Sequence, residues 1–128
     1  MQVKDIMITR VITVNNRKSI ADALAIMNDM NIRRLPVMEG NRLVGMIVQH
    51  DIEKAMHRPG IIPETPVEWI MSKRPVAVAP EDDIIRAAEL LITHKISGLP
   101  VLDNGELVGI ISEIDILKLF IETFAHKN

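Results

Sequence analysis

The sequence contains no cysteine and few aromatic residues, and each absence excludes a class of function. Without cysteine, the 128-residue chain can form neither a disulfide nor a catalytic thiolate. It has only two Phe and one Trp, a net charge of −2 and no basic tail. A nucleic-acid surface needs clustered Lys and Arg and usually stacking aromatics, so nucleic acid is not an expected partner.

Long hydrophobic segments and catalytic clusters are missing as well. No run approaches the roughly 18 uncharged apolar residues of a membrane helix, and the first residues lack the apolar region of a signal peptide. We therefore expect a soluble cytoplasmic protein without membrane contact. The four His show no metal-ligand spacing, and Ser112 has no His within its motif. Neither a metal site nor a nucleophile–base pair is predicted, so we expect no enzyme activity and no catalytic cofactor.

The sequence does contain an internal repeat. Residues 3–56 return as residues 67–120 at a constant offset of 64 without a gap, and 18 of the 54 aligned pairs are identical. We expect repeat 1 over residues 1–57, a stiff Pro-rich linker over 58–66 and repeat 2 over 67–125. Two like units that share one core pack around a pseudo-two-fold axis, and function is sought where the copies differ.

Each repeat is predicted to contain a short helix, a strand, a helix, two strands and a last helix. Ser19 and Asp83 are the expected N-caps of the helix that follows the first strand. Turn residues at 39–41 and 103–105 predict a hairpin in each copy. The fold class is therefore α/β (α+β), with a small three-stranded mixed sheet in each repeat and helices packed on one face.

Proline and glycine occur at matching positions of the predicted strands. Pro36 and Pro100 cannot donate to a ladder, so we expect them at a strand start or an edge. Gly45 and Gly109 lie inside strands, which indicates that another backbone or a ligand approaches closely.

Ser112 and Asp115 lie where a buried strand gives way to a helix. Exposed N–H groups at a helix N-terminus favour an anion. Ser112 could bond a phosphate there, while Asp115 could accept from two ribose hydroxyls. The alternative is that Ser112 is simply an N-cap and Asp115 a first-turn acid. Copy one keeps Asp51 but has Val48 in place of the serine, so the two sites are expected to be unequal.

Arg33 and Arg34 form an adjacent basic pair just before a strand. Such a pair near a cleft suits phosphate, although many Arg pairs are merely solvated. In copy two, Ser97 and Gly98 replace them. Gly98 lets a flat group lie against the backbone, or serves packing alone.

The last helix, from about Glu113 to Phe124, is apolar over more than one stripe. One part of it is expected to face the core and the other a second subunit, through the surface of Ile114–Phe124. The alternative is a helix buried wholly within the monomer.

The duplicated unit resembles the CBS domain, a module named after cystathionine β-synthase that occurs in pairs called Bateman modules. The resemblance rests on Ile-x-x-Leu-Pro-Val before each hairpin, and on Leu-Val-Gly-x-Ile followed by a strand-end Asp. It covers about residues 3–56 and 67–121 and leaves no catalytic or transport domain over. It implies a stand-alone CBS pair that binds AMP, ADP, ATP or S-adenosylmethionine in clefts between the repeats.

The resemblance also assigns site residues, because the family completes each pocket with residues of the opposite repeat. The main nucleotide site would consist of Asp115, Ser112, Ile110, Thr9, Ile12, Ile32, Arg33 and Arg34, with the Arg pair toward the phosphates. The second, weaker site would consist of Asp51, His50, Ser72, Lys73, Val76, Ile96, Ser97 and Gly98.

The sequence thus predicts a homodimeric regulatory module that binds an adenine nucleotide and signals to a partner protein it does not identify. One rival is a structural or oligomerisation module without a ligand, and a second is a small enzyme acting on a nucleotide. A third is a CBS pair specific for S-adenosylmethionine. The Arg pair disfavours this last alternative, because a sulfonium needs no phosphate clamp.

Overall fold

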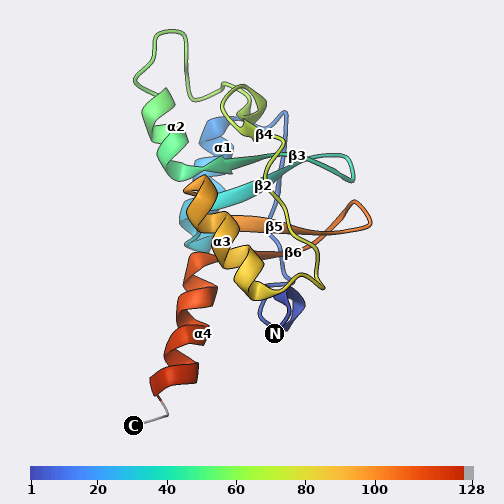
Figure 1. The fold of residues 1–128 in the computed structure, drawn as a ribbon. Helices are drawn as coiled ribbons and strands as arrows, with labels where there is room; N and C mark the ends of the chain where they lie inside the picture. The colour runs from blue at the N-terminus through green and yellow to red at the C-terminus, as the bar shows by residue number, and fades with distance from the viewer. Residues whose placement is uncertain (126–128) are drawn as a thin grey trace. The chain divides into compact units, whose positions relative to one another are not determined.

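The computed structural model describes residues 1–125 and divides into two compact units (Figure 1). The first-repeat unit is Ile12–Pro75, and the second-repeat unit is Met1–Val11 together with the chain from Val76 onward. The fold is mixed α/β, as predicted. The sequence repeats and the compact units do not coincide, since the first eleven residues belong to the unit built from repeat 2.

The first-repeat unit contains a four-stranded sheet in the order β1-β2-β3-β4. Its strands are β1 (Val14–Asn15), β2 (Arg34–Glu39), β3 (Arg42–Val48) and β4 (Ser72–Lys73). β1 runs parallel to β2, and the other two pairings are antiparallel. The three strands expected from repeat 1 are therefore present, and the fourth comes from the sequence of repeat 2.

The second-repeat unit follows the same plan with shorter pairings. β5 (Gly98–Asp103) and β6 (Glu106–Ser112) form an antiparallel pair. A single parallel bridge joins Val78 to Val101, and a single antiparallel bridge joins Ile8 to Ile110. These bridges take the places of β1 and β4, so this unit has a two-stranded sheet with two one-residue extensions where three strands were expected.

Four α-helices and two short 3₁₀ helices complete the described residues. They are α1 (Ile20–Met30), α2 (Gln49–Ala55), α3 (Ile84–His94), α4 (Glu113–Ala125), η1 (Val3–Asp5) and η2 (Val67–Trp69). None of the helices within residues 1–125 is long and apolar enough to cross a lipid bilayer.

The two predicted N-caps are confirmed. The Asp22 N–H donates to Ser19 Oγ at 3.0 Å, and the Ile85 N–H donates to Asp83 Oδ1 at 2.9 Å. Each bond satisfies one of the N–H groups that a helix start leaves without an intrahelical acceptor. α1 and α3 therefore begin at equivalent positions through different side chains.

The linker also fixes the start of α1. The Ile20 N–H donates to the Thr65 carbonyl at 2.8 Å, and the Ala21 N–H donates to the Pro63 carbonyl at 3.1 Å. Thr65 itself is buried, and its Oγ1 accepts from the Ile62 N–H. These bonds hold the Pro-rich segment against the first-repeat unit.

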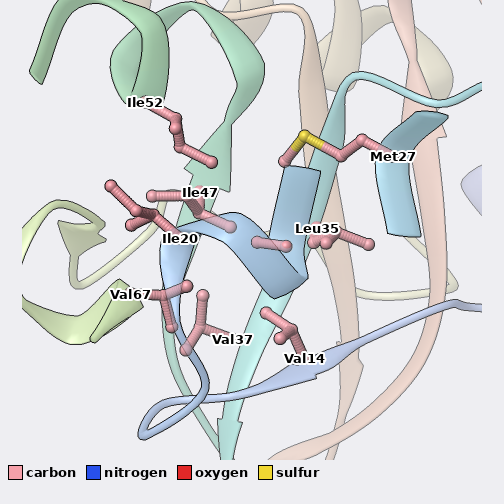
Figure 2. Packing of buried hydrophobic residues seen from close by; sticks show 9 residues of the cluster. Val14, Ile20, Met27, Leu35, Val37, Ile47, Ile52 and Val67 are labelled. Carbon is pink, nitrogen blue, oxygen red and sulfur yellow. The ribbon is translucent and has the colours of Figure 1, made fainter. Parts of the chain in front are cut away.

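The first-repeat core lies between the sheet and its two α-helices (Figure 2). Leu35 and Val37 alternate along β2, and Ile47 of β3 pairs with Leu35, so the three side chains share one face of the sheet. The helical members of the same cluster are Ile20, Ala23 and Met27 of α1 and Ile52 of α2. Both helices therefore pack on one face, as expected.

The second-repeat core includes residues from the beginning of the chain. Val3 is fully buried in it, and Ile6 and Met7 pack against it. Backbone bonds hold this leader segment in place, because the Val3 N–H donates to the Asp82 carbonyl and Ile8 exchanges two bonds with Ile110. The remaining buried members of the cluster are Val78, Ala87, Leu91, Leu99, Val101 and Ile111.

The two strand glycines mark where another chain segment crosses each β-hairpin, residues 7–8 at Gly109 and residues 71–72 at Gly45. The close neighbours at each are a methionine side chain and a backbone carbonyl. A Cβ on Gly109 would lie 2.7 Å from Met7 Sδ and 3.0 Å from the Ile8 carbonyl oxygen. A Cβ on Gly45 would collide with Met71 Sδ and would lie 2.8 Å from the Ser72 carbonyl oxygen. Only glycine leaves room for the segment that crosses it.

Pro36 occupies the third position of β2 rather than its start. β1 pairs with β2 only from Val37 onward, so on that side the first half of β2 is still an edge. The missing N–H therefore costs no ladder bond to β1. In the hairpin of the second copy, Asn104 and Gly105 have φ of 51° and 84°, the left-handed pair of a tight two-residue turn.

Candidate functional site

In the second-repeat unit, Ser112 and Asp115 are bonded to each other. Asp115 Oδ2 accepts from the Ser112 N–H at 2.8 Å and from Ser112 Oγ at 2.9 Å. In return, the Asp115 N–H donates to Ser112 Oγ at 3.3 Å. This reciprocal arrangement is a capping box, which fixes the junction of β6 and α4.

The capping role does not use the whole carboxylate. Both bonds to Asp115 end on Oδ2, and no donor within the described residues 1–125 bonds Oδ1. Asp115 is half-buried, while Ser112 is buried. The capping role weighed for this pair is therefore present, and one oxygen remains for a ligand hydroxyl.

Four of the eight residues predicted for the main site lie in this unit. The paired bonds between Ile8 and Ile110, both 2.9 Å long, bring the leader alongside β6. Thr9, the next residue, is exposed there, and Ile110 is half-buried. The group in the second-repeat unit is Thr9, Ile110, Ser112 and Asp115, whereas Ile12, Ile32, Arg33 and Arg34 lie in the first-repeat unit.

The corresponding helix start in the first-repeat unit has no capping box. Val48 is the N-cap of α2 and supplies no side-chain bond. Asp51 is half-buried, and within residues 1–125 its carboxylate makes none of the bonds that Asp115 makes. Among the described residues, these capping bonds therefore use one carboxylate oxygen of Asp115 and none of Asp51.

Three basic residues lie on or just before the strands next to β3, which leads into α2. Arg34 lies opposite Val48 across the β2–β3 pair, and the Gln49 N–H donates to the Arg33 carbonyl at 2.8 Å. Lys73 lies opposite Gly45 on the other side of β3. Arg33 and Lys73 are exposed and Arg34 is half-buried. Arg34 and Lys73 pair with positions of β3 that are three residues apart, so their side chains leave opposite faces of the sheet.

The second predicted site is divided in the same way. His50, Asp51, Ser72 and Lys73 lie in the first-repeat unit, and Val76, Ile96, Ser97 and Gly98 lie in the second-repeat unit. Within the latter, Gly98 pairs with Ser112, and the Glu113 N–H donates to the Ser97 carbonyl at 2.9 Å. The combination of residues from both repeats in one pocket stays a prediction.

One link was not predicted from the sequence. In each unit a backbone bond ties the residue before the hairpin to the first residue of the following helix, Arg33 to Gln49 and Ser97 to Glu113. The signal was the identical separation of sixteen residues in both copies. This bond couples the position of the segment before each hairpin to the start of the helix that follows it.

The site offers hydrogen-bond acceptors and cations. Ser112 Oγ donates to the Asp115 carboxylate and accepts from the Asp115 N–H, so both of these bonds lie within the helix cap. Within residues 1–125, no three His, Asp or Glu side chains are grouped closely enough to hold a metal ion. The arrangement is suited to binding a polar ligand.

Comparison with known proteins agrees with the resemblance. The sequence profile of the CBS domain matches residues 3–58 and 67–122. The CBS domain-containing protein YhcV of Bacillus subtilis is 36% identical over 110 residues, which cover 86% of this chain and 79% of the relative. An inosine-5′-monophosphate dehydrogenase from Korarchaeum cryptofilum is 31% identical over 119 residues, 92% of this chain but only 24% of the enzyme.

Two solved structures share the fold and were determined with ligands. The CBS domain pair of protein MJ0100, in complex with 5′-methylthioadenosine and S-adenosyl-L-methionine, is 32% identical with a TM-score of 0.88. That similarity covers 96% of this chain and 98% of the other. CBSX2 in complex with AMP is 26% identical with a TM-score of 0.81, covering 95% and 97% of the two chains.

CBS domain pairs are generally regulatory modules rather than catalysts. The profile match spans both repeats, and the fold agrees with that of solved CBS pairs. The chain therefore belongs to the CBS domain family and consists of two CBS domains, at residues 3–58 and 67–122.

Proposed function

We propose that this chain is a regulatory module without catalytic activity that binds AMP, ADP or ATP and signals the bound state to a partner protein. The observation that supports the proposal most is the Ser112–Asp115 pair, which holds one carboxylate oxygen free at a helix start. A CBS pair of similar fold was solved with AMP.

The proposed chemistry assigns one part of the ligand to each group. Asp115 Oδ1 accepts from the ribose hydroxyls, and the N-terminus of α4 favours an anionic or polar group. The phosphates are assigned to Arg33 and Arg34, whose guanidinium groups match phosphate oxygens in pairs. Asp51 serves a second, weaker position, because Val48 offers no hydroxyl to a ligand.

A second candidate ligand is S-adenosylmethionine or methylthioadenosine. The solved CBS pair of MJ0100 contains both. None of the four predicted main-site residues in the second-repeat unit, Thr9, Ile110, Ser112 and Asp115, is basic. If the ligand uses only this unit, a compound without phosphate is favoured over a nucleotide.

We also propose that the module acts as a cytoplasmic homodimer. The apolar residues of α4 support this, since five of them are exposed and none of the helix is buried. A ligand that stabilises one arrangement of the dimer over another shifts the population that the partner recognises.

Titration calorimetry with AMP, ADP, ATP, S-adenosylmethionine and methylthioadenosine tests the proposal, with thermal shift as a second readout. A ligand at 100 times its dissociation constant adds about 2.7 kcal/mol of stability, which is several degrees for a domain of this size. Asp115→Ala should weaken binding, while Asp29→Ala, at an exposed position on α1, should not.

Two outcomes would contradict the proposal. If none of the ligands binds saturably at millimolar concentration, the chain is a structural module without a ligand. Conversion of a bound nucleotide, followed by chromatography and lost in Asp115→Ala, would make the chain an enzyme.

A further inference from the structure

Two methionines occupy equivalent places in the two repeats. Met7 and Met71 each follow a short 3₁₀ helix and are separated by the same offset of 64 that relates the repeats. The Met7 N–H donates to the Val3 carbonyl at 2.9 Å. The Met71 N–H makes the equivalent bond to the Val67 carbonyl, also at 2.9 Å. The same local turn therefore places both residues.

Each methionine sulfur fills the side-chain space that a strand glycine leaves empty. A Cβ on Gly109 would lie 2.7 Å from Met7 Sδ and 3.1 Å from Met7 Cγ. A Cβ on Gly45 would collide with Met71 Sδ and would lie 2.9 Å from Met71 Cγ. Since non-bonded carbon atoms are in optimal contact at about 3.5–4.0 Å, neither side chain has spare room on the side that faces the strand.

Met7 and Met71 combine this close packing with access to solvent. Met7 packs against the second-repeat core, and Met71 packs against the first-repeat core. Both residues are nevertheless half-buried rather than buried. By comparison, Met27 is 1% exposed and Met30 is 53% exposed. A small reagent in solution can therefore reach Met7 and Met71, and a change at either sulfur acts on the packing of a strand.

The chemistry open to an accessible thioether is oxidation by a peroxide. The O–O bond of the peroxide breaks and an S–O bond forms, so sulfur loses two electrons and hydrogen peroxide is reduced to water. The product, methionine sulfoxide, is polar and chiral, and reductases return it to the thioether. Over a strand glycine, the added oxygen needs room that the packing does not leave, and the new polar group costs stability if it lacks a hydrogen bond.

We propose that Met7 and Met71 are reversible oxidation sites, and that their sulfoxides loosen the chain segment that crosses each hairpin. After Met7, the next residue exchanges two backbone bonds of 2.9 Å with Ile110 of β6. After Met71, the next two residues form β4, which pairs with β3 at two positions. Because both segments are short, loss of the sulfur packing opens the sheet edge of the unit to which each belongs.

The sulfoxide of Met71 is expected to have the larger effect. At Gly45, an added Cβ would lie 2.8 Å from a backbone carbonyl oxygen, whereas the corresponding distance at Gly109 is 3.0 Å. The methionine Cγ is also closer at Gly45, at 2.9 Å rather than 3.1 Å. The segment over Gly45 is therefore packed more tightly, and it leaves less room for an oxygen atom on the sulfur.

Titration with hydrogen peroxide, followed by peptide mass spectrometry and urea unfolding, tests the proposal. Exposed Met30 should be oxidised first, without a change in the urea midpoint. Oxidation of Met7 and Met71 should follow and lower the midpoint by roughly 0.5–1 M, while Met27 stays reduced because it is 1% exposed. Methionine sulfoxide reductases A and B should then restore the parent midpoint, since together they reduce both sulfoxide epimers.

Leucine variants assign the effect to the two sulfurs, because leucine approximates the volume of methionine and has no thioether. The double variant Met7→Leu, Met71→Leu should keep its midpoint at a peroxide dose that lowers that of the parent. The matched control is Met30→Leu combined with Met56→Leu, which replaces residues that are 53% and 41% exposed. This control should lose as much stability as the parent. Of the single variants, Met71→Leu should protect more than Met7→Leu.

Hydrogen exchange on the oxidised parent locates the loosened segment and does not depend on any variant folding. The N–H groups of Ile8 and Ile110, which bond across this contact, should exchange about ten-fold faster or more after oxidation of Met7. The increase should exceed that of the N–H groups inside α1 and α3, because the opening is local. An equal increase at all of these positions would show general unfolding and overturn the local contact.

Three further results would overturn the proposal. If Met7 and Met71 stay reduced when Met30 and Met56 are fully oxidised, the two residues are not oxidation sites. If both sulfoxides form and the midpoint is unchanged, they do not loosen the crossing segments. If the parent and the double leucine variant lose equal stability, the damage lies elsewhere. No nucleotide is added, so these failures are separate from any failure of the proposed function.

Discussion

The two helix starts that follow the hairpins each have an aspartate at the equivalent position, but the two aspartates differ in their hydrogen bonds. Asp115 is tied to Ser112 by two bonds to one oxygen, whereas Asp51 follows Val48 and makes no such bond. The start of α4 thus has side-chain capping bonds, whereas the N-cap of α2 supplies none. The residue three positions before the aspartate, Ser112 in one copy and Val48 in the other, therefore decides whether the helix start has a capping box.

The two units also differ in charge. The first-repeat unit has nine Lys or Arg against seven Asp or Glu, and the rest of the chain has six against ten. A phosphate, if the proposed nucleotide binds, would be attracted more to the first-repeat unit, where Arg33 and Lys73 are exposed. The second-repeat unit supplies neutral and acidic groups suited to hydroxyls. The two units are therefore not equivalent in charge.

The largest expected effect comes from removing the preorganised carboxylate. Asp115→Ala should weaken the tightest ligand ten- to a hundred-fold or more, since hydrogen bonds to a charged group are worth about 1.5–3 kcal/mol each. Asp51→Ala should change that binding event less. Calorimetry on both variants beside the parent decides, and the opposite ranking would show that the capped site is not the tighter one.

The next effect concerns the charge difference. Arg33→Ala combined with Arg34→Ala should weaken ATP and AMP by at least ten-fold and adenosine much less, because charge-assisted bonds to phosphate are lost. Arg33→Ala alone is the control for folding, since that side chain is exposed. Equal losses for all three ligands would remove the Arg pair from the phosphate role.

A smaller effect distinguishes the close contacts at Gly45 and Gly109. Gly45→Ala should destabilise the protein by about 1–3 kcal/mol, because its Cβ would meet the Ser72 carbonyl oxygen at 2.8 Å. Gly109→Ala should cost less, since the Ile8 carbonyl is at 3.0 Å and the nearer atom belongs to the flexible Met7 side chain. Urea unfolding measures both, and a stabilised Gly45→Ala variant would contradict the close approach.

The smallest effect restores the missing cap. Val48→Ser should allow a capping box with Asp51 and stabilise the protein by about 1 kcal/mol. Val48→Ala is the matched control, because it removes the same apolar contact without adding a hydroxyl. If serine and alanine unfold at the same urea concentration, the two helix starts do not differ through their caps.

Local structure could be predicted from sequence wherever one residue type fulfils one local requirement. Ser19 and Asp83 cap helices because their oxygens reach a nearby N–H. Asn104 and Gly105 turn a hairpin because both tolerate a positive φ. The strand–helix junction at Ser112–Asp115 was predicted, and the capping alternative named for this pair is confirmed, whereas its role in a nucleotide site stays a prediction.

Hydrophobic patterns could not predict that residues 1–11 pack with repeat 2 and that the first-repeat unit extends to Pro75. Val3 fits any apolar core, so its periodicity does not reveal that it packs with repeat 2. The available clue was that each copy has a glycine inside a strand and a methionine before it or after it at equivalent positions of the repeat. Gly45 contacts Met71, and Gly109 contacts Met7. Assignment of site residues to a common pocket depends on how the repeats combine, and local spacing carries no information about that.

The packing of residues 1–11 with the second repeat has a consequence for the order in which the chain folds. The first-repeat unit is contiguous and has all its residues once Pro75 has been synthesised. Residues 1–11 emerge earlier but must wait for Asp82 and Ile110 to be made before they can dock. Removal of residues 1–11 would therefore take Val3 out of the second-repeat core, while the first-repeat unit would retain every residue of its own core.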